Sequence, residues 1–233
     1  MDRNSISNGI NRSWTALEKL GLAESFSNSG PLGVNPTFRD LVLSEESRYV
    51  DIYSTGLSLS HYNILLTDYS YFQFSWDKKD NVRYAYYPNP YVAGKSNESI
   101  NFKRRRNLVN TGVITQEEYL SMLRDSNDEL RVPLIRYENA PEQHKGLKHP
   151  CSHMHIGHHG ENRWPLNRVL TPTAFTLWIT KQYYSDEWWI LGKDDQNEFG
   201  NILEHELVKE KANCRPVASE YFLDLEARSF YLG

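Results

Sequence analysis

Histidine is concentrated in one short segment of this chain. Six of its eight histidines fall between His144 and His159, within sixteen residues. Imidazole changes its charge near neutral pH, so it can accept a proton, donate one or bind a metal ion. If His153-Met154-His155 is extended, the two imidazoles share a face, on Cα atoms roughly 6.6 Å apart. That spacing suits two groups flanking one reacting centre, or two ligands of one metal ion.

Two further polar residues have the spacing to join these histidines. Arg136 and Glu138 alternate in the preceding segment, Leu-Ile-Arg-Tyr-Glu-Asn-Ala-Pro, so they share a face if it is also a strand. Neighbouring strands would then supply a general base, a general acid and an arginine that stabilises a phosphorane. In RNA the ribose 2′-hydroxyl can itself attack the adjacent phosphate. This set of residues therefore favours cleavage of RNA without a metal ion. An ordinary ion pair on a sheet is the alternative for Arg136 and Glu138.

A metal site is the second interpretation of the same segment, since imidazole and thiolate suit zinc. The ligands would be His153, His155, His158 and His159, with Cys151 as a further candidate. Their spacing matches no standard zinc pattern, and the second half of the chain has no partner set of Cys and His residues. We therefore expect no cofactor, with zinc as the alternative.

Two groups of cations are candidates for substrate binding. The first is the basic run Lys103, Arg104, Arg105 and Arg106. Such a run would hold a phosphate backbone through contacts that do not depend on sequence, although a solvated loop is the alternative. The second is Arg163 and Arg168, which flank Trp164. Arginine beside an aromatic ring can bind and stack a base, and a core tryptophan with arginines at its rim is the alternative.

The elements that must position these residues follow from periodicity and capping patterns. Helices are predicted over 5–22, from the capping box at Thr115 to about 124, from Thr171-Pro172 through 183, and over 202–211. Strands are predicted as a β-meander over 49–92, then over 131–138 and 153–157, with a final strand or mixed segment over 221–232. In the strand over 153–157, Met154 and Ile156 would face the core. The segments 28–37, 93–110 and 139–150 are predicted loops, and His144 and His149 would be solvated there.

The order of these elements predicts the fold class. Strands and helices do not alternate at the spacing of βαβ units, so an α+β fold is favoured. We expect a largely antiparallel β-sheet packed by helices on one side, with an N-terminal helix. We expect a single domain over 1–233, with a helical lead-in over 1–37 and the core over 45–233.

Composition is typical of a globular protein and excludes several other classes. The chain has 233 residues, of which 39% are hydrophobic and 13% aromatic, enough for one good core. A net charge of −4 argues against a general nucleic-acid-binding surface. Two cysteines, Cys151 and Cys214, predict no disulfide framework. We find neither an apolar signal region nor a run of roughly 18 apolar residues, so we expect a cytoplasmic protein that makes no membrane contact.

The motifs around the histidines resemble those of an uncharacterised bacterial family with a domain of unknown function. Its signature is a Ser-His-x-His-x-Gly strand, followed by a helix that opens with Thr-Pro and ends in aromatic residues. In this chain Ser152–Gly157 carries the first part, Thr171-Pro172 opens the helix and Tyr183-Tyr184 ends it. The resemblance covers the chain from about residue 45 onward.

The segment that begins at Arg136 is also similar to one in the TumE-type toxins of bacterial toxin–antitoxin systems. Those toxins carry Arg-Tyr-Asp-Asn-Ala-Pro-His-His before a second segment similar to Pro-His-His-x-His. In this chain Glu138 replaces the Asp, and Glu142-Gln143 replaces the first His pair. The matching positions are Arg136, His153 and His155. This resemblance implies a toxin-like or phage-defence effector that acts on RNA and is restrained by an antitoxin or a larger defence complex.

The resulting hypothesis is a small metal-independent endoribonuclease. His153 and His155 would be its general base and acid, in an order that the sequence leaves open. Arg136 would stabilise the transition state, and Glu138 would orient a histidine or share in proton transfer. One alternative is a non-catalytic partner-binding module, antitoxin-like or a scaffold, whose histidines stabilise an interface. Another is a metal-dependent hydrolase.

Overall fold

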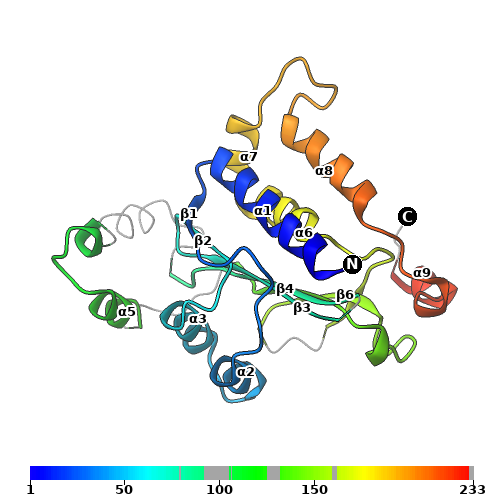
Figure 1. Ribbon diagram of the computed structural model, residues 1–233, viewed down its shortest axis with the longest axis horizontal. Coiled ribbons are helices and arrows are strands. Elements are labelled where there is room, and N and C mark those ends of the chain that lie inside the picture. The colour runs from blue at the N-terminus through cyan, green and yellow to red at the C-terminus, as the bar shows by residue number, and fades with distance from the viewer. Residues whose placement is uncertain (79, 92–104, 106, 125–131, 159–161, 231–233) are drawn as a thin grey trace.

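The computed structural model describes residues 1–233 except 79, 92–104, 106, 125–131, 159–161 and 231–233 (Figure 1). Its centre is a seven-stranded sheet in which every pairing is antiparallel and the strand order follows the chain. The strands are β1 (Ala23–Phe26), β2 (Ile64–Leu66), β3 (Tyr71–Lys78), β4 (Asn81–Tyr87), β5 (Ile135–Asn139), β6 (Ser152–Ile156) and β7 (Trp164–Pro165). The α+β class and the antiparallel sheet are therefore confirmed.

One face of the sheet carries the larger core. Phe72 and Phe74 of β3 alternate with residues of the other face, as their spacing predicts, and they contact Phe175 edge-on. That residue belongs to α6 (Pro172–Tyr183), which lies beside α1 (Arg3–Lys19) over the sheet (Figure 1). The connected helices α7 (Ser185–Leu191) and α8 (Ile202–Asn213) complete this layer. Thr171 caps α6 by accepting a hydrogen bond from Ala174 N, as Thr171-Pro172 predicts.

Helices also cover part of the other face, so the expectation of helices on one side was wrong. The helices α2 (Pro36–Leu43) and α3 (Tyr49–Ser58) lie on the side opposite α1 and α6 (Figure 1). Their buried side chains pack with Tyr71 and Tyr87 of the sheet in a second apolar cluster. The physical reason is that β3 and β4 carry apolar side chains on both faces near Tyr71 and Tyr87. A strand that is buried on both faces needs a layer of helices on each side.

The N-terminal segment, expected as a helical lead-in over 1–37, packs into the larger core. Ile6 and Ile10 of α1 are completely buried in the larger cluster, and β1 pairs with β2. A Cβ atom on Gly9 would lie 2.8 Å from Cδ of Pro172, so glycine allows α1 and α6 to approach closely. Arg12 of α1 donates two hydrogen bonds to buried Glu210 of α8, at 3.0 and 3.1 Å.

Two other segments are helical where the structure describes them, namely the start of the predicted meander and the predicted strand or mixed segment over 221–232. The start of the predicted meander forms α3, in which Tyr49, Tyr53 and Leu57 recur at helical spacing and are buried. The C-terminal segment forms η2 (Ser219–Tyr221) and α9 (Asp224–Phe230). The capping box at Thr115 is confirmed at the start of α5 (Gln116–Arg124). Among the described residues, no helix is long and apolar enough to cross a membrane.

Candidate functional site

The hairpin of β5 and β6 brings the four predicted catalytic residues together. Arg136 lies opposite His155 in the antiparallel register, and Glu138 lies opposite His153. All four residues therefore share one face of the sheet, as their alternation in the sequence predicts. Between the two strands, η1 (Pro141–Gln143) and the rest of a short loop reverse the chain.

His153 is completely buried, and its hydrogen bonds define its tautomer. Its Nδ1 lies 2.7 Å from the carbonyl oxygen of Pro150. Since a carbonyl oxygen only accepts, Nδ1 carries a hydrogen and donates it. In the neutral ring Nε2 then holds a lone pair, and this atom lies 3.0 Å from Nε2 of His155. One proton therefore lies between the two Nε2 atoms, donated by His155 to His153.

Burial is the main cause that lowers the pKa of His153 to about 4; the positive charge of a protonated His155 acts in the same direction, and the negative charge of Glu138 opposes it. Burial also lowers the pKa of His149, as does the positive charge of Arg163. The imidazoles of His153 and His149 are consequently neutral at pH 7. A neutral imidazole with a lone pair can act as a general base.

Glu138 adds a carboxylate to the histidine pair. One ligand atom from each of Glu138, His153 and His155 can be chosen so that all three lie within 4.8 Å of one another. Two imidazoles and a carboxylate form a donor set that suits zinc and other divalent transition metals. The bond from Nδ1 of His153 to the Pro150 carbonyl also matches the outer hydrogen bond that usually fixes a metal-binding histidine. These residues therefore fit a metal ion as well as proton transfer.

The expected four-histidine ligand set is not what the structure brings together. His158 points elsewhere, because its Nε2 lies 2.7 Å from the carbonyl oxygen of Ser47 and its ring packs edge-on against Tyr49. The chain turns between β6 and His158 at Gly157, whose φ of +98° lies in a region that favours glycine. His159 lies outside the described residues.

Cys151, the other candidate ligand, is also separate from the histidine pair. Its Sγ lies 3.6 Å from Oδ1 of Asn139, and burial raises the pKa of its thiol to about 11. The thiol is therefore protonated at neutral pH, whereas metal binding requires the thiolate.

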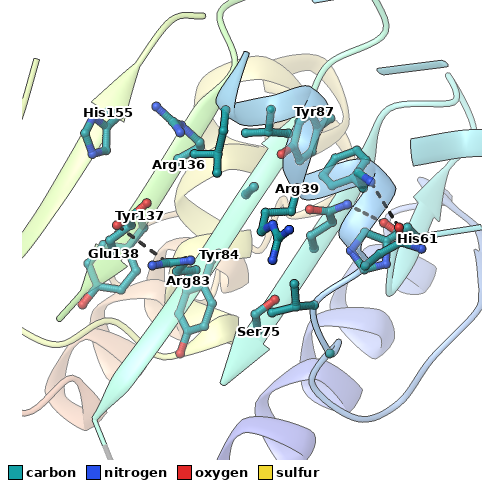
Figure 2. A pocket seen from close by; sticks show the side chains of 18 of the residues that line it. Arg39, His61, Ser75, Arg83, Tyr84, Tyr87, Arg136, Tyr137, Glu138 and His155 are labelled. Carbon is teal, nitrogen blue, oxygen red and sulfur yellow. Dashed lines mark hydrogen bonds and ion pairs between the residues drawn. The ribbon is translucent and has the colours of Figure 1, made fainter. Parts of the chain in front are cut away.

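A cavity of about 490 Å³ opens on the same face and extends from β6 to α2. We call it the site cavity. Figure 2 shows Arg136, Glu138 and His155 at one side and His61 at the other. Among the residues that the structure describes, four arginines contribute to its lining, namely Arg39, Arg83, Arg136 and Arg163. Nε of Arg136 is buried and has no hydrogen-bond partner among the described residues. Arg83 pairs with Glu138, and Arg39 pairs with Asp40. Guanidinium groups are suited to bind an anion such as a phosphate.

His149 is a member of the site that the sequence analysis placed in solvent. Its ring lies 5.0 Å from that of His153, and the residue is partly buried at the wall of the site cavity. The adjacent Pro150 supplies the carbonyl that orients His153. The sequence analysis missed His149 because this residue lies in a predicted loop. The density of histidines around it was the signal that could have indicated its place in the site.

The other predicted cations are distributed differently. Arg163 lines the site cavity, whereas Nη1 of Arg168 donates to the carbonyl oxygen of Cys214 at 2.7 Å and so ties two segments together. Trp164 is 53% exposed on β7 and is not a core residue. From the basic run, Arg105 is exposed. The remaining members, Lys103, Arg104 and Arg106, lie outside the described residues.

Comparison with known proteins places this geometry in a family. The profile of the uncharacterized conserved protein DUF2290 matches residues 32–232. The chain belongs to the DUF2290 family. The match contains every strand from β2 onward, so the site cavity lies within the DUF2290 region, while α1 and β1 precede it. No curated protein and no solved structure matches the chain. The expectation of a family of unknown function is confirmed.

Proposed function

We propose that this protein is an endoribonuclease that cleaves phosphodiester bonds with a histidine pair. The observation that carries the proposal is the contact between Nε2 of His153 and Nε2 of His155 at the wall of an arginine-lined cavity. The pair holds one proton between its two nitrogens and has capacity for a second. It can therefore take the proton of a ribose 2′-hydroxyl and return one to the departing 5′-oxygen.

The residues around the pair have complementary roles in this proposal. His155 lines the site cavity and meets the substrate, whereas buried His153 acts through it. Arg136 stands directly across from His155 and binds the non-bridging phosphate oxygens, where charge develops in the transition state. Glu138, opposite His153, stabilises positive charge on the pair. Attack by the 2′-oxygen yields a 2′,3′-cyclic phosphate and a free 5′-hydroxyl.

The similarity to TumE-type toxins supports an effector role. The three positions that match the two toxin segments are Arg136, His153 and His155, which meet across one hairpin. An RNA-cleaving effector in a cell would need restraint, so we propose an antitoxin or a larger defence complex as its partner.

Purified protein tests the catalytic assignment directly. We expect wild type to cleave single-stranded RNA, and His155→Ala and Arg136→Ala to lower the rate by about 100-fold or more, the usual contribution of such groups. A strand with a 2′-deoxyribose at the cleavage position should resist wild type. The matched control is His205→Ala, since His205 is an exposed histidine of α8. Full cleavage by His155→Ala would overturn the assignment.

A metal-dependent hydrolase is the second candidate, favoured by the proximity of the Glu138, His153 and His155 donor atoms. A bound divalent ion would act as a Lewis acid and lower the pKa of a bound water. This candidate predicts about one zinc or manganese per chain, lost in Glu138→Gln, and activity that a chelator removes and the metal restores. The endoribonuclease proposal instead predicts cleavage that continues in the presence of the chelator.

A further inference from the structure

The site cavity is much longer than a phosphate group requires. We propose that its end beside α2 is a nucleobase subsite, which takes one base of a single-stranded substrate next to the phosphate held by the arginines. This inference rests on the proposed endoribonuclease function and names the part of the substrate that the protein recognises.

The floor of the site cavity is a row of side chains that crosses four strands. The register aligns Gln73 with Ala85, Ala85 with Arg136, and Arg136 with His155. Three interstrand spacings separate the ends of this row, or roughly 14 Å. Ala85 is the small member, and it lines the cavity with its larger neighbours on either side. A hollow above Ala85 therefore connects the histidine end to the end beside α2.

The end beside α2 is built from aromatic rings and an amide. The ring centroid of Phe38 lies 5.1 Å from that of His61 and 5.8 Å from that of Tyr87, and all three residues line the cavity. Burial lowers the pKa of His61, so its imidazole is a neutral ring at pH 7. Gln73 donates through Nε2 to the carbonyl oxygen of His61, which identifies Oε1 as the acceptor of this amide. The aromatic rings suit the face of a heterocyclic base, and the fixed acceptor suits a donor on its edge.

The two ends together define the chemistry of the ligand. Arg83, Arg136 and Arg163 bring positive charge to one end, where Arg83 pairs with Glu138, while aromatic residues and hydrogen-bonding groups line the other end. A nucleotide has this polarity, because a phosphate and a stacking base lie at opposite ends of one sugar. Proteins that recognise single-stranded RNA stack its unpaired bases on aromatic rings and guanidinium groups in the same way.

The size of the cavity favours one base from a single strand. A volume of about 490 Å³ lies within the range of small-ligand sites, so it accommodates one nucleoside unit. A base inside a duplex reaches such a cavity only after it is unpaired and unstacked, at a cost in free energy. The cavity therefore favours a single strand over a duplex, and the 2′-hydroxyl nucleophile of the proposed function makes that strand RNA.

Direct binding tests the subsite without reference to cleavage. Calorimetry on the wild-type chain would compare a nucleoside 3′-monophosphate with ribose phosphate, which lacks the base, and with inorganic phosphate. We expect the base to increase affinity at least tenfold, the scale of stacking one base on aromatic side chains. Ala85→Leu should fill the hollow and remove that increase, so that the nucleotide and ribose phosphate bind this variant with equal affinity. Ala212→Leu makes the same change at an exposed position of α8 and serves as the control.

The outcomes separate this inference from the endoribonuclease proposal. Equal affinity for the nucleotide and ribose phosphate, or tight nucleotide binding by folded Ala85→Leu, would overturn the subsite. Base-dependent binding by wild type without RNA cleavage would refute the endoribonuclease and retain the subsite. Cleavage of single-stranded RNA at equal rates by wild type and Ala85→Leu would refute the subsite and retain the endoribonuclease. If Ala85→Leu does not fold, His61→Ala at the partly exposed wall supplies the same comparison.

Discussion

The buried His153 makes the stability of the fold depend on pH, in a direction that its surroundings determine. Its pKa is about 4 in the folded protein and near the ordinary value of 6.5 in the unfolded chain. Between these values the unfolded chain binds more protons. The contribution of His153 is therefore fully present above pH 6.5 and is lost as the pH falls toward 4. A pKa gap of this size makes the folded state less stable by roughly 2 kcal/mol at pH 5 than at pH 7.

His153→Asn isolates this contribution. Asparagine cannot titrate, and its side-chain amide can replace Nδ1 of His153 as a donor to the Pro150 carbonyl. Urea unfolding at pH 7 and pH 5, with a chelator present, measures the loss of stability in each protein. With a slope of about 2 kcal/mol per molar urea, the wild-type midpoint should fall by about 1 M more than that of His153→Asn.

The control for this measurement is the exposed histidine of α8. His205→Asn removes a titrating imidazole from the surface and should leave the wild-type pH dependence intact. If wild type and His153→Asn lose equal stability between pH 7 and pH 5, burial does not hold His153 neutral. The assignment of a lone pair to its Nε2 at neutral pH would then be refuted.

Three substitutions test the packing that supports the site. Gly9→Ala should cost about 1–3 kcal/mol of unfolding free energy, because its Cβ meets Pro172, while Gly33→Ala, whose Cβ meets nothing within 4 Å, should cost less than about 0.5 kcal/mol. Tyr137→Phe should cost about 1–3 kcal/mol, because the buried hydroxyl accepts from Leu170 N and contacts Ser152. Arg12→Ala should cost a similar amount, about 1–3 kcal/mol, because buried Glu210 loses two hydrogen bonds. Urea unfolding at pH 7 measures each cost.

Each of these expectations has a result that contradicts it. Equal stabilities for Gly9→Ala and Gly33→Ala would show that α1 and α6 are free to move apart. A Tyr137→Phe protein as stable as wild type would show that another group satisfies Leu170 N. If Arg12→Lys were as stable as wild type while Arg12→Ala were not, a single charge would suffice, and the paired geometry would be unnecessary.

The histidine end of the candidate site was predictable because it depends on local periodicity. Arg136 and Glu138, like His153 and His155, are two residues apart, and strand geometry places such pairs on one face whatever the rest of the fold does. A short loop joins the two segments, which favours their pairing as a hairpin. Ile156 is the exception on this strand, because it was expected to face the core and is 36% exposed near the strand end.

The rest of the site depends on contacts between distant parts of the chain. Arg39 and Phe38 reach the site cavity from α2, about 100 residues before β5, and no period in the sequence links them to the histidines. Helix α3 was misassigned because its tyrosines and β-branched residues favour strands. Burial of Tyr53 against Tyr71 on the second face of the sheet outweighs that preference.

The packing of α1 against α6 also has a consequence for the chain during synthesis. Each strand pairs with its neighbours in sequence, so most of the sheet can form as its strands emerge from the ribosome. In contrast, α1 ends at Lys19 and its partner begins at Pro172. Translation at 5–20 residues per second separates the two by roughly 10–30 seconds. During that interval α1 lacks its packing against α6, so the nascent chain exposes apolar surface that the finished protein conceals.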